Sequence, residues 1–237
     1  MGRGFAHPLL TVGLVLLRSE MIASDEIKPA LAYGWLTRFY DPVVRWTTRE
    51  RTFKSRLIAQ ANIRAGHRVL DAGCGTGTLA LAVKRACPEA IVTGVDADRT
   101  VLARAARKME ATGDSVTLVE GRADSIPFAS GSFDRVISSL FFHHLDRAAK
   151  QRVFGDIHRL LVPGGELHVA DWGRPGNALM SAAFLSVQLL DGFPTTTDHR
   201  HGLLPALMRK EGFSEVEATS NLNTPCGTLS LYRAVRT

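Results

Sequence analysis

A glycine-rich turn between an apolar run and the start of a helix constrains this chain more than any other feature of its sequence. The segment VLDAGCGTGTLA, residues 69–80, begins as a predicted buried strand that ends at Asp71 and continues through Gly73, Gly75 and Gly77 into a predicted helix. Glycines at alternate positions allow a tight turn and a close approach of the backbone to a ligand. Backbone N–H groups at the start of a helix favour a negatively charged group such as a carboxylate. The segment therefore predicts a ligand-binding turn, the alternative being a glycine-rich turn that binds nothing.

Short apolar runs alternate with helical patterns from Gly66 to the end of the chain. This alternation is typical of βαβ units and predicts a doubly wound α/β fold, with helices on both faces of a mostly parallel sheet. We predict strands at His67–Asp71, Ile91–Asp96, Val116–Glu120, Phe133–Ser139, Gly165–Asp171, Ser214–Ala218 and Thr228–Ala234. We predict helices at Thr78–Ala86, Arg99–Ala111, Asp146–Leu161, Ala178–Leu190 and Leu204–Glu211. Residues 219–227 are too few for a crossover helix, so we expect the last two strands to pair as an antiparallel hairpin.

The spacing of the glycines distinguishes two kinds of nucleotide site. The dinucleotide fingerprint G-x-G-x-x-G would require glycine at position 78, where this chain has Thr78. The pattern present is D-x-G-x-G-x-G, and the second strand ends in the segment GVDAD, residues 94–98. A carboxylate at that strand end can accept hydrogen bonds from both hydroxyls of a ribose. We assign this role to Asp96, because Asp98 is better placed to cap the helix that follows.

Ligand-type residues also follow the third and fourth predicted strands. Asp124 comes after the third strand and can accept a hydrogen bond from an exocyclic amine such as that of adenine; the alternative is an N-cap or an Asx-turn. The fourth strand ends at Ser138, Ser139 and Leu140. Because ligands of open α/β sheets bind outside the carboxyl ends of the strands, these neighbouring strand ends indicate one site.

These segments, taken in order, resemble the successive motifs of class I S-adenosylmethionine-dependent methyltransferases. The motifs lie at residues 69–80, 94–98, 120–128, 133–145 and 159–172, and the resemblance covers about residues 33–237. More narrowly, they resemble the small-molecule branch that includes the ubiquinone and menaquinone C-methyltransferases. The resemblance implies a seven-stranded sheet of order 3-2-1-4-5-7-6 with the seventh strand antiparallel. It also implies that S-adenosylmethionine is the cofactor and S-adenosylhomocysteine the product.

The resemblance further implies roles for individual residues. It places Gly73 and Gly75 against the methionyl part of the cofactor, Asp96 on the ribose and Ser139 behind the sulfonium. The predicted cofactor-binding residues are Asp71, Gly73, Cys74, Gly75, Gly77, Asp96, Ala97, Ala123, Asp124, Ser139 and Tyr40.

Within this set, the resemblance assigns the adenine ring to Asp124 and to the backbone of Ala123. Cys74 is a position of backbone contact, and we do not expect it to act as a nucleophile.

Two histidines, His143 and His144, follow the fourth strand at the rim where donor and acceptor would meet. Methyl transfer from a sulfonium is an in-line displacement, so the protein mainly aligns the reactants and excludes water. A base helps if the acceptor is an acidic carbon or a phenol, and histidine titrates near neutral pH. We predict that His143 and His144 are catalytic or contact the substrate, the alternative being that they cap the helix near Asp146. The cluster TTTDHRH, residues 195–201, is predicted to form a polar lid rather than a metal site, and no metal is expected.

The first 63 residues are predicted to lie outside the sheet. Residues 1–32 are expected to be an irregular or partly disordered extension, whose apolar run at 9–17 is shorter than the about 20 residues that span a bilayer. A peripheral membrane contact through this region is the alternative. The methyltransferase domain is predicted at 33–237, with a helical lid at about 33–63 from which Tyr40 would contact the cofactor. Alternatively, that helical region only covers the sheet edge.

Composition limits the class of partner. The net charge of +6 comes from 29 Lys and Arg against 23 Asp and Glu, but the basic residues are spread along the chain, which disfavours a nucleic-acid surface. The fourth strand ends in SSLFF, without the N/D-P-P-Y or Pro-Cys elements of nucleic-acid methyltransferases. Three widely spaced cysteines fit neither a disulfide framework nor a zinc motif and predict a reducing, cytoplasmic location. We expect a monomer or homodimer acting on a small molecule, such as a hydrophobic quinone or lipid precursor, the alternative being a non-catalytic S-adenosylmethionine-binding or S-adenosylhomocysteine-binding protein.

Overall fold

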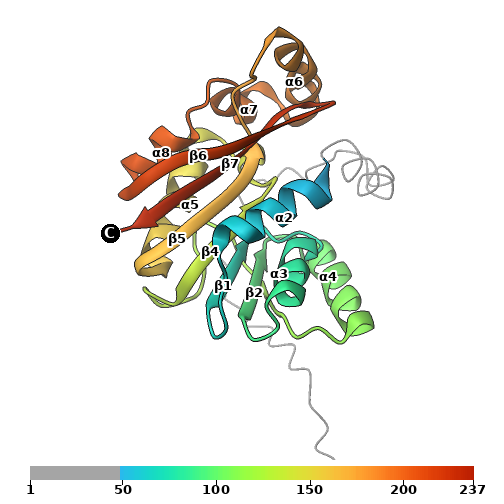
Figure 1. Cartoon of the computed structure of the whole chain (residues 1–237), viewed down its shortest axis with the longest axis vertical. Helices are drawn as coiled ribbons and strands as arrows, with labels where there is room; N and C mark the ends of the chain where they lie inside the picture. Colours follow the sequence, from blue (N-terminus) through green and yellow to red (C-terminus); the bar gives the residue numbers. More distant parts are fainter. Residues whose placement is uncertain (1–48) are drawn as a thin grey trace, which may run out of the picture.

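The computed structural model describes residues 49–237, which form one seven-stranded sheet with helices on both faces (Figure 1). The strand order is β3-β2-β1-β4-β5-β7-β6. Strands β1 to β5 pair in parallel, and β7 runs antiparallel to both of its neighbours. The strands are β1 (Arg68–Ala72), β2 (Ile91–Asp96), β3 (Thr117–Glu120), β4 (Phe133–Ser139), β5 (Leu161–Trp172), β6 (Phe213–Thr224) and β7 (Gly227–Arg236). The predicted fold class, strand order and terminal hairpin are thereby confirmed.

Strands β5, β6 and β7 are longer than their predicted ranges, β5 and β6 most of all. Strand β5 begins at Leu161, which pairs with Phe133 of β4 before the register shifts at a bulge. Gly164 within this stretch has a positive φ of 76°, a conformation that is unusual in a regular strand. The sequence pattern of ordinary strands therefore did not predict that β5 begins before Gly165. Strand β6 continues to Thr224, and only residues 225 and 226 connect it to β7. The hairpin is therefore tighter than the loop predicted at 219–227.

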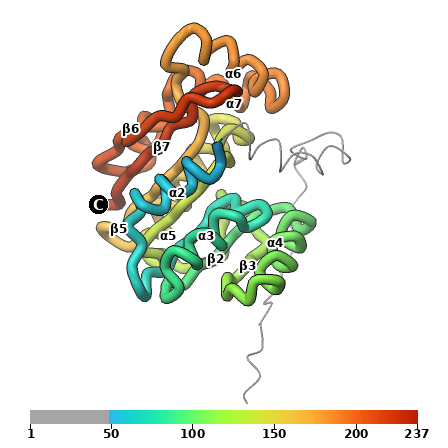
Figure 2. Tube along the Cα trace, turned by 45° about the vertical axis from the view of Figure 1, so that its right-hand side comes forward, coloured from blue at the N-terminus to red at the C-terminus, as the bar shows by residue number. Residues whose placement is uncertain are grey.

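Helices cover the two faces of the sheet unequally (Figures 1 and 2). Helices α2, α3 and α4 pack on one face with one buried apolar cluster, and α5 and α8 pack on the other face with a second cluster. Helices α6 and α7 pack against each other near the start of β7. The helices are α2 (Glu50–Ala61), α3 (Thr78–Ala86), α4 (Arg99–Thr112), α5 (Arg147–Leu160), α6 (Ala178–Asp191), α7 (Phe193–Arg200) and α8 (Leu204–Lys210), with the short 3₁₀ helix η1 (Phe142–His144) after β4.

Side-chain caps fix the start of three helices. The carboxylate of Asp98 accepts hydrogen bonds from the backbone amides of Thr100 and Val101, which confirms the predicted cap of α4. Asp146 caps α5 and Asn177 caps α6 in the same way. His143 and His144 therefore do not cap α5, because Asp146 does so and both histidines lie within η1.

Helix α7 was not predicted from the sequence, because its run of threonines between Gly192 and His199 has weak helix propensity. In the structure, the hydroxyls of Thr196 and Thr197 donate to backbone carbonyls one turn earlier, at 2.6 Å each. These hydroxyls are thereby satisfied within the helix, so packing against α6 decides the local structure.

Helix α2 is the described part of the predicted helical lid at 33–63. Phe53, Leu57 and Ala61 are fully buried, and the helix packs across β4 and β5 (Figure 1). The rest of that region, including Tyr40, and the predicted extension at 1–32 lie outside the described residues. None of the described helices is both long enough and apolar enough to span a membrane.

Candidate active site

The glycine turn connects β1 to α3 and is hydrogen-bonded to the neighbouring strand β2. The backbone amides of Gly73 and Cys74 both donate to the carbonyl of Val95 in β2, at 2.9 and 3.0 Å. Gly73, Gly75 and Gly77 all have positive φ, between 52° and 70°, a conformation that residues with a Cβ atom rarely adopt. A Cβ atom at Gly73 would lie 2.4 Å from the ring of Phe141, whereas one at Gly75 would meet no atom of residues 49–237 within 4 Å. The turn is thus closed on one side by Phe141 and open above Gly75.

Asp71 stabilises the helix start that follows the turn. Its side chain is buried, and Oδ2 accepts a hydrogen bond from the backbone amide of Ala80, at 3.0 Å, in the first turn of α3. Burial raises the pKa of Asp71 to about 7. Asp71 therefore positions the start of α3. The direct cofactor contact that the sequence predicts for Asp71 is a different role and stays a prediction.

Asp96 lies at the carboxyl end of β2 and faces the turn. Its Oδ2 accepts from the amide of Gly75 at 2.8 Å, and its Oδ1 accepts from the amide of Asp98 at 2.9 Å. Burial raises the pKa of Asp96 against the opposing effect of these backbone hydrogen bonds. Each carboxylate oxygen has a second lone pair, so Asp96 can still accept hydrogen bonds from two hydroxyl groups. Ala97, beside it, is exposed.

The loop after β3 begins next to Asp96, because the amide of Gly121 donates to the backbone carbonyl of Asp96 at 3.0 Å. The carboxylate of Asp124 accepts from the guanidinium of Arg122 at 2.9 and 3.0 Å and from that of Arg152 at 3.2 Å. The hydrogen bond from Arg122 lowers the pKa of Asp124. The structure thus gives this carboxylate two guanidinium partners, and its predicted contact with adenine is left untested. Ala123 packs half-buried against the core.

Cys74 lies within the turn, and Ser139 ends the neighbouring strand β4. The thiol of Cys74 is buried against Gly94, and burial raises its pKa well above the ordinary value, which opposes a nucleophilic role. Ser139 is half-buried at the end of β4, where it pairs with Ala170 of β5. The hydroxyl of Ser138 donates to the carbonyl of Ala72 at 2.7 Å and joins the ends of β4 and β1.

The buried carboxylate of Asp171, at the end of β5, organises the segment after β4. It accepts hydrogen bonds from the backbone amides of Phe141 and Phe142, at 3.1 and 2.7 Å, and from that of Trp172. Nδ1 of His143 lies 2.7 Å from its Oδ1. Burial acts to raise the pKa of Asp171, but the positive charge and the hydrogen bond of His143 outweigh it and lower that pKa. Burial acts to lower the pKa of His143, and Asp171 outweighs it and raises that pKa.

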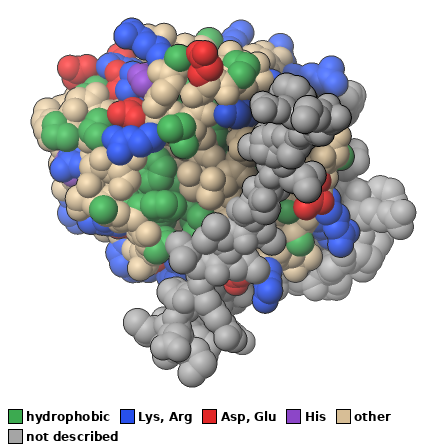
Figure 3. Space-filling model, turned by 90° about the horizontal axis from the view of Figure 1, so that it is seen from below, with side chains coloured by type: hydrophobic (Ala, Val, Ile, Leu, Met, Phe, Trp, Pro, Cys, Tyr) green, Lys and Arg blue, Asp and Glu red, His purple; other side chains and the backbone are tan. Residues whose placement is uncertain are grey.

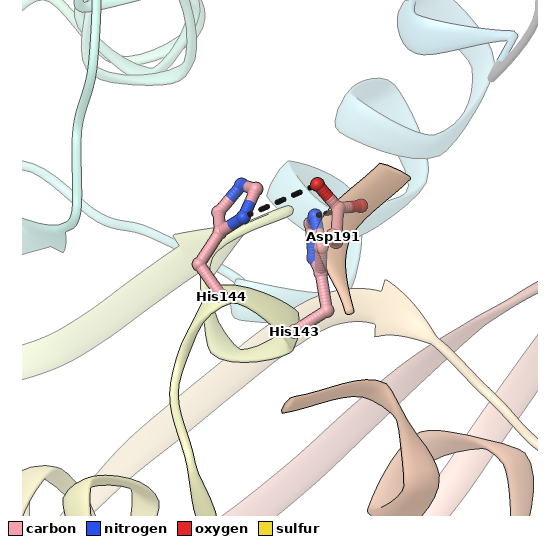
Figure 4. Close-up of side chains that lie close together, drawn as sticks. All are labelled: His143, His144 and Asp191. Carbon is pink, nitrogen blue, oxygen red and sulfur yellow. Dashed lines mark ion pairs between the residues drawn. The ribbon is translucent and has the colours of Figure 1, made fainter. Parts of the chain in front are cut away.

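His144 and Asp191 complete this cluster (Figure 4). Nδ1 of His144 lies 3.7 Å from one carboxylate oxygen of Asp191, and Nε2 of His143 lies 3.8 Å from the other. The side chain of His143 is 3% exposed, that of Asp191 16% and that of His144 27%. Burial and the neighbouring His143 lower the pKa of His144, and burial raises the pKa of Asp191. The two histidines predicted from the sequence therefore do lie together, next to an acid that was not predicted.

The second polar cluster of the sequence does not form one site. Asp198 pairs with Arg147 and Lys150, and Nδ1 of His199 bonds to the carbonyl of Trp172 at 2.8 Å. His201 is exposed at the end of α7. Asp198 and His199 are buried, so they do not form the surface of a polar lid.

Two residues of the site escaped the sequence analysis. Asp171 ends the fifth strand, and the strand-end argument used for Asp96 would have found it. Asp191 ends α6, far along the chain from the histidines, and no local pattern indicates that it meets them.

Comparison with known proteins agrees with this geometry. Residues 69–165 match a family model described as a methyltransferase domain. This segment is therefore similar to a methyltransferase domain. The demethylmenaquinone methyltransferase of Thermus thermophilus is 37% identical to it over 123 residues, which are 52% of this chain and 55% of that protein. The chain thus spans about half the length of the curated relatives it matches.

Solved structures share the fold of this chain. A SAM dependent methyltransferase from Aquifex aeolicus superposes with a TM-score of 0.60 at 15% identity, over 78% of this chain and 89% of that chain. Phosphoethanolamine N-methyltransferase 2 of Haemonchus contortus, in complex with S-adenosyl-L-methionine, superposes with a TM-score of 0.62 at 19% identity. That match covers 78% of this chain and 52% of the other.

Proposed function

We propose that this protein transfers a methyl group from S-adenosylmethionine to a small-molecule acceptor. The observation that supports this most directly is the hydrogen bond from the amide of Gly75 to Asp96, because it brings the glycine turn and the acid together at the carboxyl ends of neighbouring strands. When bound, S-adenosylmethionine supplies an electrophilic methyl group on a sulfonium centre.

The residues present fit that cofactor. Within the described part of the chain, no atom lies within 4 Å of a Cβ placed at Gly75, as a close approach of the methionyl part requires. Asp96 keeps lone pairs for the ribose hydroxyls, and half-buried Ser139 stands at the neighbouring strand end. In this proposal, Gly73, Gly75 and Gly77 contact the amino-acid end of the cofactor. The loop containing Ala123 and Asp124 faces the adenine end.

The acceptor end of the site is proposed at His143 and His144. Both follow β4, and Asp171 fixes the orientation of His143 by a 2.7 Å contact in a buried setting. A histidine held in this way can accept a proton from an acidic carbon or a phenol if the acceptor carries one.

We further propose a hydrophobic acceptor of the quinone or lipid-precursor class. The support is the name of the Thermus thermophilus relative, a demethylmenaquinone methyltransferase, together with the apolar side chains of Phe141 and Trp172 beside the histidines. Lys and Arg side chains are interspersed with acidic ones on the face drawn in Figure 3, an arrangement that disfavours a nucleic-acid surface. A cytoplasmic monomer or homodimer, with any membrane contact made through the N-terminal region, completes the proposal.

The test is methyl transfer from S-adenosylmethionine labelled in its methyl group to a reduced naphthoquinone and to a cell extract. We expect a labelled small molecule whose mass has gained one CH₂, and no such product with the Asp96→Ala variant. Cofactor binding without transfer to any acceptor would instead show a binding protein and overturn the proposal.

A further inference from the structure

The cluster of His143, His144 and Asp191 has the composition and spacing of a metal site. One ligand atom from each residue lies within 4.8 Å of those from the other two. The two histidine-to-carboxylate distances of 3.7 and 3.8 Å are too long for hydrogen bonds. Zinc ligands lie about 2.0–2.1 Å from the ion, so two ligands of a tetrahedral zinc ion are about 3.3 Å apart. The two histidine-to-carboxylate distances exceed this separation by about half an ångström, and no pair of the three ligand atoms is more than 4.8 Å apart, so small side-chain rotations would bring them around one ion.

The surroundings orient one of these ligands in advance. Nδ1 of His143 contacts Asp171 at 2.7 Å, which leaves Nε2 directed to the side of Asp191 (Figure 4). Asp171 is itself held by three backbone amides. Metal-binding histidines commonly donate their second ring N–H to a carboxylate in this way, which fixes the ring and increases its basicity.

Charge and access also suit a cation. The carboxylates of Asp171 and Asp191 supply two negative charges beside two imidazoles, which would balance a divalent ion. The nearest buried cation, Lys150, is paired with Asp198 at 3.3 Å. His144 is 27% exposed, so the cluster is shielded but can be reached from solvent.

A second, independent observation comes from His199. Its side chain is fully buried, its ring lies 6.2 Å from that of His143, and its Nε2 has no hydrogen-bond partner among the described residues. Buried polar atoms are nearly always satisfied by a protein group, a water or an ion. His199 thus places a third buried imidazole close to His143, with a ring nitrogen that no described residue satisfies.

We propose that Nε2 of His143, Nδ1 of His144 and a carboxylate oxygen of Asp191 bind a divalent transition-metal ion of the zinc class. Imidazole with one carboxylate favours such ions over Mg²⁺ and Ca²⁺, which prefer oxygen ligands. Three protein ligands leave a fourth position for water or another small ligand. Metal binding does not depend on methyl transfer and goes beyond it. One consequence rests on the proposed function: because the ion occupies the imidazole nitrogens assigned to the acceptor, we expect Zn²⁺ to inhibit methyl transfer and a chelator to restore it.

The test is a titration of the full-length, chelator-treated protein with Co²⁺, followed by visible absorption, and with Zn²⁺ in competition. We expect one equivalent to bind with a ligand-field spectrum that Zn²⁺ abolishes. Asp191→Asn and His144→Ala should each weaken binding at least tenfold, and His201→Ala, an exposed histidine outside the cluster, should leave it unchanged. Circular dichroism checks that each variant is folded. If Asp191→Asn does not fold, the comparison of His144→Ala with the wild type tests the metal site.

Absence of saturable Co²⁺ binding would overturn the inference, as would equal affinities of the wild type and the two cluster variants. Calorimetry with S-adenosylmethionine on the same preparations separates this result from the proposed function. Protein that binds the cofactor but no Co²⁺ overturns the metal site alone.

Discussion

The carboxylate of Asp96 accepts a hydrogen bond from the backbone amide of Gly75, 2.8 Å away, and this contact closes the turn after β1 against the end of β2. Gly75 lies in the turn after β1, and Asp96 ends the neighbouring parallel strand β2. Their contact is consistent with the register that pairs Asp71 with Gly94 and Ala72 with Val95. Fold and site therefore depend on each other at this point.

Replacing Gly75 with alanine is expected to damage cofactor binding beyond its effect on stability. A non-glycine residue at a positive φ costs about 1–2 kcal/mol, and the new methyl group would point into the open space of the site. Gly66 is a matched control, because it also has a positive φ and open surroundings but lies before β1. Urea unfolding should show similar losses of stability in Gly75→Ala and Gly66→Ala, and calorimetry should show weaker S-adenosylmethionine binding only in Gly75→Ala. Equal cofactor affinity in both variants would contradict the placement of the ligand.

Removing the carboxylate of Asp124 is expected to matter less than removing that of Asp96. Arg122 and Arg152 already donate to the Asp124 oxygens, so few lone pairs face a ligand. We expect Asp124→Ala to raise the dissociation constant of S-adenosylmethionine less than tenfold. A larger loss would indicate that Asp124 leaves its arginine partners to bind adenine, as the sequence predicted.

Variants His143→Ala and His144→Ala are expected to lower turnover by about 10²–10⁴-fold in the presence of a chelator, if the acceptor carries an acidic proton. Their affinity for S-adenosylmethionine should change much less, because the glycine turn and Asp96 are untouched. His201→Ala serves as the control, because this histidine is exposed at the end of α7. Steady-state kinetics with and without each substitution measures both quantities, and activity equal to the parent would exclude a role for the cluster in proton transfer.

Acid sensitivity is expected at Glu166 on β5. Hydrogen bonds from His168 and Arg233, at 2.9 and 2.8 Å, lower its pKa to about 2. The unfolded-state value is about 4.3, so the stabilisation is fully present above that pH and is lost as the pH falls towards 2. Glu166→Gln should lower the free energy of unfolding by about 1 kcal/mol at neutral pH, allowing for solvent screening, and should converge with the wild type in acid.

The control for that experiment is Glu217→Gln, which removes a weaker and more exposed partner of the same arginine, 3.7 Å away. Urea unfolding between pH 3 and 7 compares the three proteins. A difference between Glu166→Gln and the wild type that does not shrink as the pH falls would contradict the assigned pKa.

Much of the fold was predictable because its strands and helices follow simple periodic patterns. The predicted bounds of β2 and β4 agree with the structure, and Asp98 caps α4 as expected. Helix α7 was missed because its threonines favour helix only when their hydroxyls bond to carbonyls of the same helix. The longer β5 depends on a bulge, which is a tertiary feature of the pairing with β4.

The site was predictable only where its residues are close to a strand end. Asp96 and Gly75 meet because neighbouring parallel strands end at the same edge. Asp191 meets His143 and His144 only because α6 and α7 fold back over η1, a contact between distant segments that no local pattern contains. The partners of Asp124 also depend on such a contact, since Arg152 comes from α5.

Calorimetric titration of S-adenosylmethionine into the wild type and Asp96→Ala tests the central claim most directly. Loss of two charge-assisted hydrogen bonds costs roughly 2–4 kcal/mol, so we predict a dissociation constant about 30- to 1000-fold higher for Asp96→Ala. Asp98→Ala, which removes a neighbouring carboxylate used only as a helix cap, should bind nearly as the wild type does. Equal dissociation constants for the wild type and Asp96→Ala would contradict the account.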